Sequence, residues 1–217
     1  MTNLTTTFTS IVNRALIKLG EEPIATFDPD TPTTTIQKAV SYTLQAICDQ
    51  VLALQPWATA SIWYTFSSSD DATVPSQSLY TLAYNLPTGF IRLTGEAKIN
   101  GYYFSPDFGP SPYKITGSLF LTYCAGWEIE YVKTQTINAA SDTAAAAWSQ
   151  TLKNLIANYW AYENAHFITG GFEAKKLLAA DVAFMETIAC MVDASGQAPQ
   201  MGEVGVLADA RWRGRDA

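Results

Sequence analysis

The sequence predicts an α+β protein: a four-helix bundle, with two N-terminal and two C-terminal helices, into which an antiparallel β-sandwich or barrel-like domain is inserted. Apolar residues recur at three- and four-residue steps near both ends of the chain, which is the spacing of amphipathic helices. Apolar and polar residues alternate in the middle, as they do in strands. We place the helical domain at residues 1–58 and 138–194 and the β domain at 59–137. Residues 195–217 follow neither period, so we expect an extended C-terminal tail.

The two N-terminal helices have well-marked ends. Apolar spacing predicts one helix over residues 8–19, followed by Gly20 at a left-handed C′ position and by Pro23, which cannot continue a helix. It predicts a second helix over residues 34–54, which ends before Pro56. The two apolar sets are Phe8, Ile11, Val12, Ala15, Leu16 and Leu19, and Ile36, Val40, Thr43, Leu44, Ile47, Val51 and Leu54.

The middle of the chain is a series of short alternating pieces. They are separated by Gly, Pro, Ser and Asp, and they read SIWYTFSSSD, FIRLTGEAKI, YKITGSLFLTY and WEIEYV. We therefore expect five or six short antiparallel strands over residues 60–137. Residues 100–113 read NGYYFSPDFGPSPY, and this mixture of aromatics, Gly and Pro predicts a long irregular loop that is exposed or lies against a partner.

Two further helices follow the strands. Ser141 is the expected N-cap of the third helix, because an aspartate and an alanine run of high helix propensity come after it. Gly170 and Gly171 end this helix, whose apolar residues cover enough of its circumference to predict packing on two sides. A fourth helix is predicted from Glu173 to about Ala194. Its apolar set is Leu177, Leu178, Val182, Met185, Ile188, Ala189 and Val192.

Composition narrows the class of protein. Hydrophobic residues make up 48% of the 217 residues and charged residues only 15%, which predicts a surface that other protein partly covers. The formal net charge of −7 argues against general DNA binding, which needs clustered Lys and Arg. The N-terminus has no basic segment followed by an apolar run, and no apolar run is long enough for a membrane helix. We expect neither a signal peptide nor a membrane partner.

The sequence offers little catalytic chemistry. His166 is the one histidine, and its place among aromatic residues on a helix seam favours packing over a role as a catalytic base. Cys48, Cys124 and Cys190 are widely spaced and form no CxxC pair, so we interpret them as small buried hydrophobes in a reducing compartment. The sequence contains no phosphate-loop, dinucleotide, nucleophile-elbow or zinc-protease motif. We expect no metal, no cofactor and no catalytic residue.

Carboxylate pairs lie in predicted turns: Glu21 with Glu22, Asp28 with Asp30, and Asp70 with Asp71. We interpret them as solvated turn residues, and the segment around Asp28 and Asp30 as a proline-restricted corner between two helices. Asp28-Pro-Asp30 begins like a calcium loop, but the residues that follow lack the glycine and the terminal glutamate of such a loop. A hydrolase that uses Glu22, Asp28 or Asp30 remains an alternative.

Two features favour binding to other proteins. The first is the aromatic load of the strand block and its loop; we expect about half of it in the core, because aromatics serve both packing and interfaces. Its candidate contact residues are Tyr102, Tyr103, Phe104, Phe108 and Tyr113. An alternative use of these aromatics is carbohydrate binding. The second feature is the basic and aromatic end ARWRGRDA, with the residue types that dominate binding hot spots: Arg211, Trp212, Arg213 and Arg215.

Several segments, taken in order, resemble the tail tubular protein A, or head-to-tail adaptor, family of short-tailed bacteriophages. They are RALIKLGEEPIATFD, a long helix that ends in LQPWATA, YNLPTGFIRLTG, YKITGSLFLTY, IEYVK and AAAAWSQTLKNLIANYWA. The similarity spans roughly residues 8–194, and its specificity lies in the order and spacing of the segments. None of them is a catalytic signature.

The resemblance implies a structural protein of the virion. Proteins of this family form a ring, usually of twelve copies, between the portal that closes the capsid and the tail nozzle. Their helical part and C-terminal tail face the portal, and their strand domain faces the nozzle. The resemblance thus implies that residues 195–217 bind the portal, that residues 100–113 contact the nozzle or a neighbouring copy, and that DNA passes through an acidic lumen without sticking. It also implies assembly in the host cytoplasm.

Overall fold

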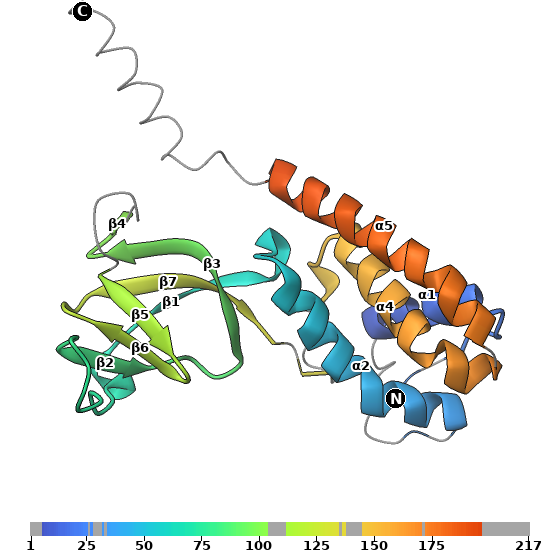
Figure 1. The fold of residues 1–217 in the computed structure, drawn as a ribbon, viewed down its shortest axis with the longest axis horizontal. Helices are drawn as coiled ribbons and strands as arrows, with labels where there is room; N and C mark the ends of the chain where they lie inside the picture. Colours follow the sequence, from blue (N-terminus) through green and yellow to red (C-terminus); the bar gives the residue numbers. More distant parts are fainter. Residues whose placement is uncertain are drawn as a thin grey trace, which may run out of the picture.

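The computed structural model describes residues 6–25, 27, 32, 34–103, 112–134, 136–137, 145–170 and 172–196. Within these residues the chain is a mixed α/β protein with four α-helices and two antiparallel sheets. Figure 1 shows the strands gathered at one end of the molecule and the helices at the other, with α2 lying nearest to the strands. We call these two parts the strand unit and the helical unit. The tail was predicted over residues 195–217, but residues 195 and 196 still belong to a helix (Phe172–Gly196), and residues 197–217 lie outside the described residues.

The two N-terminal helices follow their predicted spacing. Helix α1 (Thr6–Leu19) buries Phe8, Ile11, Val12, Ala15 and Leu16, and Gly20 follows it with a φ of +76°. Glu21 N then donates to Leu16 O at 2.9 Å, the long hydrogen bond of a Schellman C-terminus. Helix α2 (Thr35–Leu54) begins with a capping box, in which the side chains and backbone amides of Thr34 and Gln37 bond reciprocally.

The third predicted helix begins later than the sequence indicates. Helix α4 is Gln150–Thr169, and its N-cap is Ser149, whose Oγ accepts a hydrogen bond from Leu152 N at 3.2 Å. Ser141, the expected cap, lies outside the described residues. The helix cannot extend back through Trp148 and Ser149, because Ser149 has extended backbone and the buried Trp148 ring packs edge-on against Phe8. Ala145 and Ala146 are themselves helical, so the alanine run keeps its helical conformation there, and the break at Trp148 and Ser149 separates it from α4. The predicted stop at Gly170 is confirmed.

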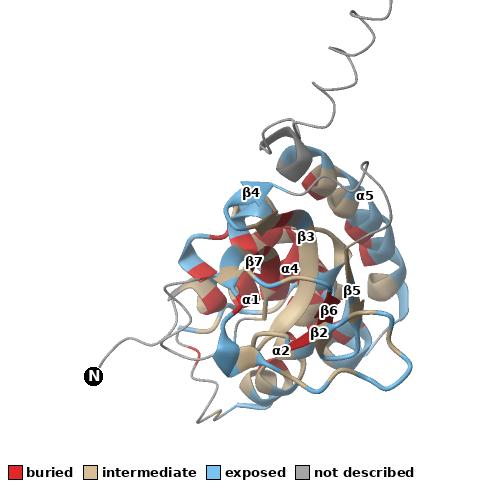
Figure 2. Cartoon of the chain, turned by 90° about the vertical axis from the view of Figure 1, so that its left-hand side faces the viewer, coloured by how far each residue is buried: buried red, intermediate tan, exposed pale blue. Residues whose placement is uncertain are grey.

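Helix α4 is the central helix of the helical unit. It contacts three helices, α1, α2 and α5 (Phe172–Gly196), whereas the sequence predicted packing on two sides. Trp160 is fully buried, and its Nε1 donates to Thr43 Oγ1 of α2 at 2.9 Å. Leu152, Leu155, Ile156 and Ala161 are buried with it. Figure 2 shows buried segments in red around the centre of the helical unit. A helix enclosed by three others has to be apolar nearly all round, which explains its composition.

The strand unit contains more strands than the five or six that we expected. One sheet has the order β1-β7-β3-β4 and the other β2-β6-β5, and all neighbours are antiparallel. The extra strands arise because YKITGSLFLTY folds into a hairpin of two strands and because two short strands escaped the alternation pattern. The strands are β1 Ser61–Thr65, β2 Leu82–Asn85, β3 Phe90–Ile99, β4 Tyr102–Tyr103, β5 Tyr113–Thr116, β6 Leu119–Thr122 and β7 Trp127–Lys133.

The two sheets share one aromatic core. Phe66, Tyr84, Phe120, Trp127 and Tyr131 form its buried cluster with Ala97 and Ile129, and members come from both sheets. Phe120 stacks on Phe66 at a centroid distance of 4.8 Å and meets Trp127 edge-on at 5.7 Å. A second, larger cluster fills the helical unit and includes Val132 from β7, so the cores of the two units adjoin.

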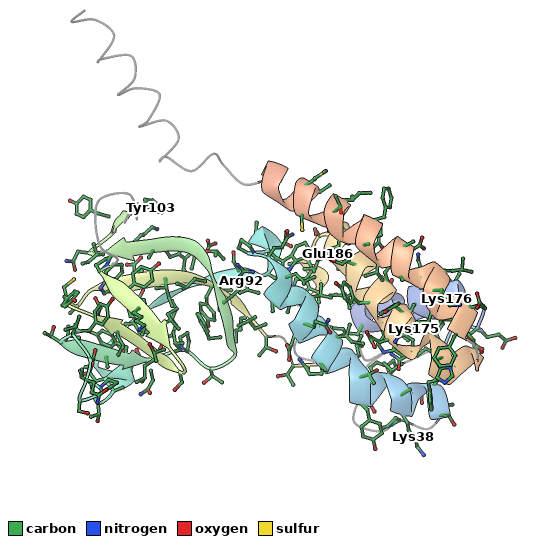
Figure 3. All side chains as sticks on the ribbon, in the orientation of Figure 1. Lys38, Arg92, Tyr103, Lys175, Lys176 and Glu186 are labelled. Atoms are coloured by element: carbon green, nitrogen blue, oxygen red, sulfur yellow. The ribbon has the colours of Figure 1, made fainter. Side chains whose placement is uncertain are left out.

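Polar side chains fasten the strand unit to α2. Gln45 Nε2 donates to Asp49 Oδ1 at 3.1 Å and to Thr134 Oγ1 at 3.3 Å, and Ile137 N donates to Gln45 Oε1 at 3.0 Å. At the end of α2, Arg92 Nη1 of β3 donates to Ala53 O at 3.0 Å, which places a cation at a helix C-terminus. Figure 3 shows Arg92 where β3 meets α2. We call the contacts of Gln45, Asp49, Arg92 and Thr134 the joint.

Candidate interaction surfaces

The residues proposed for chemistry are dispersed in the structure. Within the described ranges, no three His, Cys, Asp or Glu side chains are close enough together to hold a metal ion. His166 is exposed, and its ring stacks on Phe172 of α5 at 4.2 Å. It therefore packs against an aromatic residue as predicted, but on the surface and not in the buried seam. Helices that are long and apolar enough to cross a membrane are absent from the part of the chain that the structure describes.

The three cysteines are free, and they differ in burial. Cys48 is fully buried in α2, and burial raises the pKa of its thiol, with the nearby Asp49 carboxylate adding to the effect. A thiol held protonated in this way is a poor nucleophile. Cys124 and Cys190 are partly buried, so the expectation of three buried thiols is confirmed in full only for Cys48.

One acidic residue has a clear structural role. The Asp70 carboxylate accepts hydrogen bonds from Tyr64 Oη at 2.6 Å, from Ser67 N at 2.8 Å and from Ser67 Oγ at 2.9 Å. These bonds lower the pKa of Asp70, the Tyr64 bond contributing most, and the same bond raises the pKa of Tyr64 to about 12. Asp70 thus closes the turn after β1. Asp28 and Asp30 lie outside the described residues, and Glu22 is exposed.

Part of the predicted aromatic contact loop is exposed at one edge of the strand unit. Tyr102 is 78% exposed and Tyr103 62%, but both belong to β4 and not to an irregular loop. Lys98 Nζ lies 3.9 Å from the Trp63 ring centroid and 4.6 Å from that of Tyr103, a pair of cation–π contacts. Figure 3 shows Tyr103 at this outer edge. We call Trp63, Lys98, Tyr102 and Tyr103 the aromatic edge.

The remaining members of that predicted loop do not join the aromatic edge in the described structure. Tyr113 begins β5, and its ring stacks on Phe120 at 5.1 Å and meets Trp127 edge-on at 5.4 Å. Burial in this core raises the pKa of Tyr113. The prediction of an irregular loop is therefore wrong at both ends of residues 100–113. Phe104 and Phe108 lie outside the described residues, and so do Arg211, Trp212, Arg213 and Arg215.

Helix α5 carries an exposed apolar surface that the sequence reading missed. Leu177 is 76% exposed, Phe184 65% and Met191 66%. These residues follow one another at seven-residue steps on the side of α5 opposite to Leu178, Val182 and Ala189, which are buried. We call Leu177, Phe184 and Met191, with the intervening Ala180, Thr187 and Ile188, the α5 stripe. The predicted core set of this helix mixed both sides, because it included Leu177 together with Leu178. The seven-residue spacing was the signal that could have separated them.

Comparison with known proteins assigns no family, because no family model matches the chain and no curated protein matches it.

Proposed function

We propose that this chain is a structural protein of a bacteriophage virion: a head-to-tail adaptor that forms a ring, of about twelve copies, between the portal and the tail nozzle. In this proposal the four helices form a bundle that carries an inserted β-sandwich, and the C-terminal tail extends to the portal. The chain has no enzymatic activity, assembles in the host cytoplasm and lines a channel through which DNA passes. Its net charge of −7 keeps DNA phosphates from adhering to the channel wall.

The observation that carries the proposal is the amount of large apolar surface left exposed on both units. The strand unit exposes Tyr102, Tyr103 and Leu79, and the helical unit exposes Leu177, Phe184 and Met191, each by more than half. A protein with only 15% charged residues has few charges with which to keep such surfaces apart. Burial against sister copies and neighbouring virion proteins explains both facts. The particular assembly, a ring between the portal and the tail nozzle, is inferred from the sequence resemblance to the adaptor family.

Light scattering tests the proposal directly. The full chain is measured alone and together with the portal protein of the same virion. We expect a ring-sized complex on the portal, whether or not the chain assembles by itself. A chain that stays monomeric and does not bind the portal would refute the proposal.

The tail makes a second test possible. We expect Trp212→Ala to weaken portal attachment about tenfold or more, since truncation of a tryptophan hot spot typically removes 2 kcal/mol or more. Thermal unfolding of the isolated subunit should stay nearly unchanged. Attachment is measured by co-sedimentation with the portal, and Ala210→Ser serves as a control beside the same site. Equal attachment of Trp212→Ala and the unaltered chain would contradict a portal-binding role for Trp212.

A carbohydrate-binding module is the second candidate, because the aromatic edge leaves Tyr102 and Tyr103 exposed for stacking on sugar rings. Lys98 already occupies a position over the Trp63 and Tyr103 rings, so a sugar at those two rings has to displace a cation. A glycan array probed with the full chain decides: binding that Tyr102→Ala abolishes would favour this function over the adaptor. The hydrolase alternative requires a metal at Glu22, Asp28 or Asp30, and calorimetry with calcium, magnesium or manganese would detect it.

A further inference from the structure

We infer that the α5 stripe is the surface through which one copy of this chain contacts a second copy. The inference deepens the proposed function, on which it rests for the ring, by assigning the contact to named residues. It starts from the position of α5 at the rim of the helical unit, where α4 covers its inner side (Figure 1). The stripe lies on the outer side, which Figure 2 shows as mostly exposed.

The fold of the single chain does not need the stripe. Leu178 and Ala189 already bury the inner side of α5 in the helical core, and Val182 is buried as well. The exposed Leu177, Phe184 and Met191 therefore add apolar surface without adding to that core. A seven-residue repeat of apolar residues is the spacing with which one helix fits along another. The occupant that the stripe fits is consequently an apolar face with helical ridges, which every copy of this chain presents on its own helices.

The charges around the stripe favour a second copy over a charged partner. The stripe itself contains no ionisable residue, and the neighbouring charges are paired inside the chain. Lys176 Nζ, next to Leu177 in the chain, lies 2.8 Å from Glu173 Oε1, and Lys18 Nζ lies 3.1 Å from Asp181 Oδ2. Figure 3 shows Lys176 on α5. Two copies that each carry −7 approach most easily where the local charges are already compensated.

The apolar area is close to what a contact between two copies requires. A standard interface takes about 800 Å² from each partner, of which about 60% is apolar. With 76%, 65% and 66% of their surfaces exposed, Leu177, Phe184 and Met191 present on the order of 100 Å² each. They supply well over half of that apolar share, and Ala180, Thr187 and Ile188 lie between them. The stripe is thus large enough to form the centre of such an interface, with polar residues as its rim.

The test uses the full chain and a matched pair of substitutions. Leu177→Glu places a charge in the stripe, and Leu79→Glu places the same charge on the strand unit, at a leucine that is 84% exposed. Sedimentation velocity over a range of concentrations up to about 100 µM measures self-association. We expect the unaltered chain and Leu79→Glu to associate alike, and Leu177→Glu to weaken association about 100-fold or more. Phe184→Glu is the second stripe variant, and circular dichroism confirms that each variant is folded.

A crosslink identifies the occupant. A photoreactive phenylalanine analogue at position 184 should join two copies of the chain on irradiation. The inference is overturned if the unaltered chain stays monomeric at all concentrations, if Leu177→Glu associates like the unaltered chain, if Leu79→Glu is equally defective, or if an associating chain gives no crosslink between copies. These outcomes are separate from portal binding: a monomer that forms a ring only on the portal refutes the inference and leaves the adaptor proposal intact. A chain that associates through α5 but does not bind the portal supports the inference and refutes the adaptor proposal.

Discussion

The hydrogen bond between Tyr64 and Asp70 makes the strand unit sensitive to pH. The folded chain lowers the pKa of Asp70 and raises that of Tyr64 to about 12. A lowered carboxyl pKa adds stability that is present above the unfolded pKa of about 4 and is lost as pH falls through the folded value. A raised tyrosine pKa adds stability that is present below about pH 10 and is lost as pH rises through 12. The pair therefore stabilises the fold between these limits.

Tyr64→Phe tests this pair. We expect the substitution to lower the free energy of unfolding at pH 7 by roughly 0.5–1 kcal/mol, a value reduced for solvent screening because the pair is only partly buried. The difference from the unaltered chain should shrink below about pH 4, where Asp70 becomes protonated in the unfolded state. Urea unfolding at pH 7 and pH 3 measures it. A difference that is equal at both pH values would show that lost packing, and not the hydrogen bond, is responsible.

Gly126 illustrates a residue that its neighbourhood fixes. It has a φ of +86°, and a Cβ there would collide with the side-chain oxygen of Asn100, whose backbone N–H donates to Gly126 O at 2.8 Å. We expect Gly126→Ala to lower the free energy of unfolding by about 2–3 kcal/mol, from backbone strain and steric overlap together. Gly117→Ala is the control, because Gly117 has a φ of +59° and no atom within 4 Å of an added Cβ. It should cost about 1 kcal/mol. Equal losses of unfolding free energy for Gly126→Ala and Gly117→Ala in urea would mean that the Asn100 side chain moves away from the added Cβ without a measurable cost.

Among the elements, α4 has the greatest influence on stability, because α1, α2 and α5 all pack on it. Ser149→Ala removes its N-cap, and we expect a loss of about 1 kcal/mol in the free energy of unfolding. Ser149→Asp keeps a capping oxygen and should stay within a few tenths of a kcal/mol of the unaltered chain. Thermal and urea unfolding measure both. If Ser141→Ala were damaging and Ser149→Ala neutral, the helix would begin at Ser141, as the sequence pattern indicates.

Helix α5 shows how an element can serve two purposes. Its inner side contributes Leu178 and Ala189 to the helical core, while its outer side carries the stripe. Both sides are apolar, so the helix has no clear polar face in the sequence. This composition is expected of a helix between a core and a partner, and not of one at a free surface.

The molecule as a whole depends on the joint, because it sets how the strand unit is held relative to the helices. Gln45→Ala removes contacts to Asp49, Thr134 and the amide of Ile137. We expect a loss of about 1–2 kcal/mol in the free energy of unfolding, since the Ile137 amide loses its acceptor while Thr134 Oγ1 still donates to Asp49 Oδ1, and a wider distribution of distances between the units. Small-angle scattering measures that distribution and calorimetry the stability. Lys38→Ala, an exposed change on the same helix, is the control. An unchanged scattering profile with Gln45→Ala would show that apolar packing around Val132 and the other joint contacts hold the units together without Gln45.

Much of the fold could be predicted because it depends on neighbouring residues in the chain. The bounds of α1 and α2, the left-handed Gly20 and the full length of β3 follow from periodicity and turn chemistry within a few residues. The interaction surfaces were less accessible. Tyr102, Tyr103 and Tyr113 were predicted as one contact loop, yet two are exposed at an edge and the third lies in the aromatic core. Nothing local to these tyrosines distinguishes them.

By itself the sequence determined which segments form helices and strands, where most of them end, and that chemistry at His166 or the cysteines is poorly supported. Local propensity, capping and alternation act over a few residues, and they are readable without the rest of the chain. The tertiary structure decided the start of α4, the division of the aromatic residues between core and edge, the joint at Gln45, and the outward direction of Leu177, Phe184 and Met191. An apolar period indicates that a side of a helix or strand is suited to burial, but only the arrangement of distant segments determines whether this chain covers it.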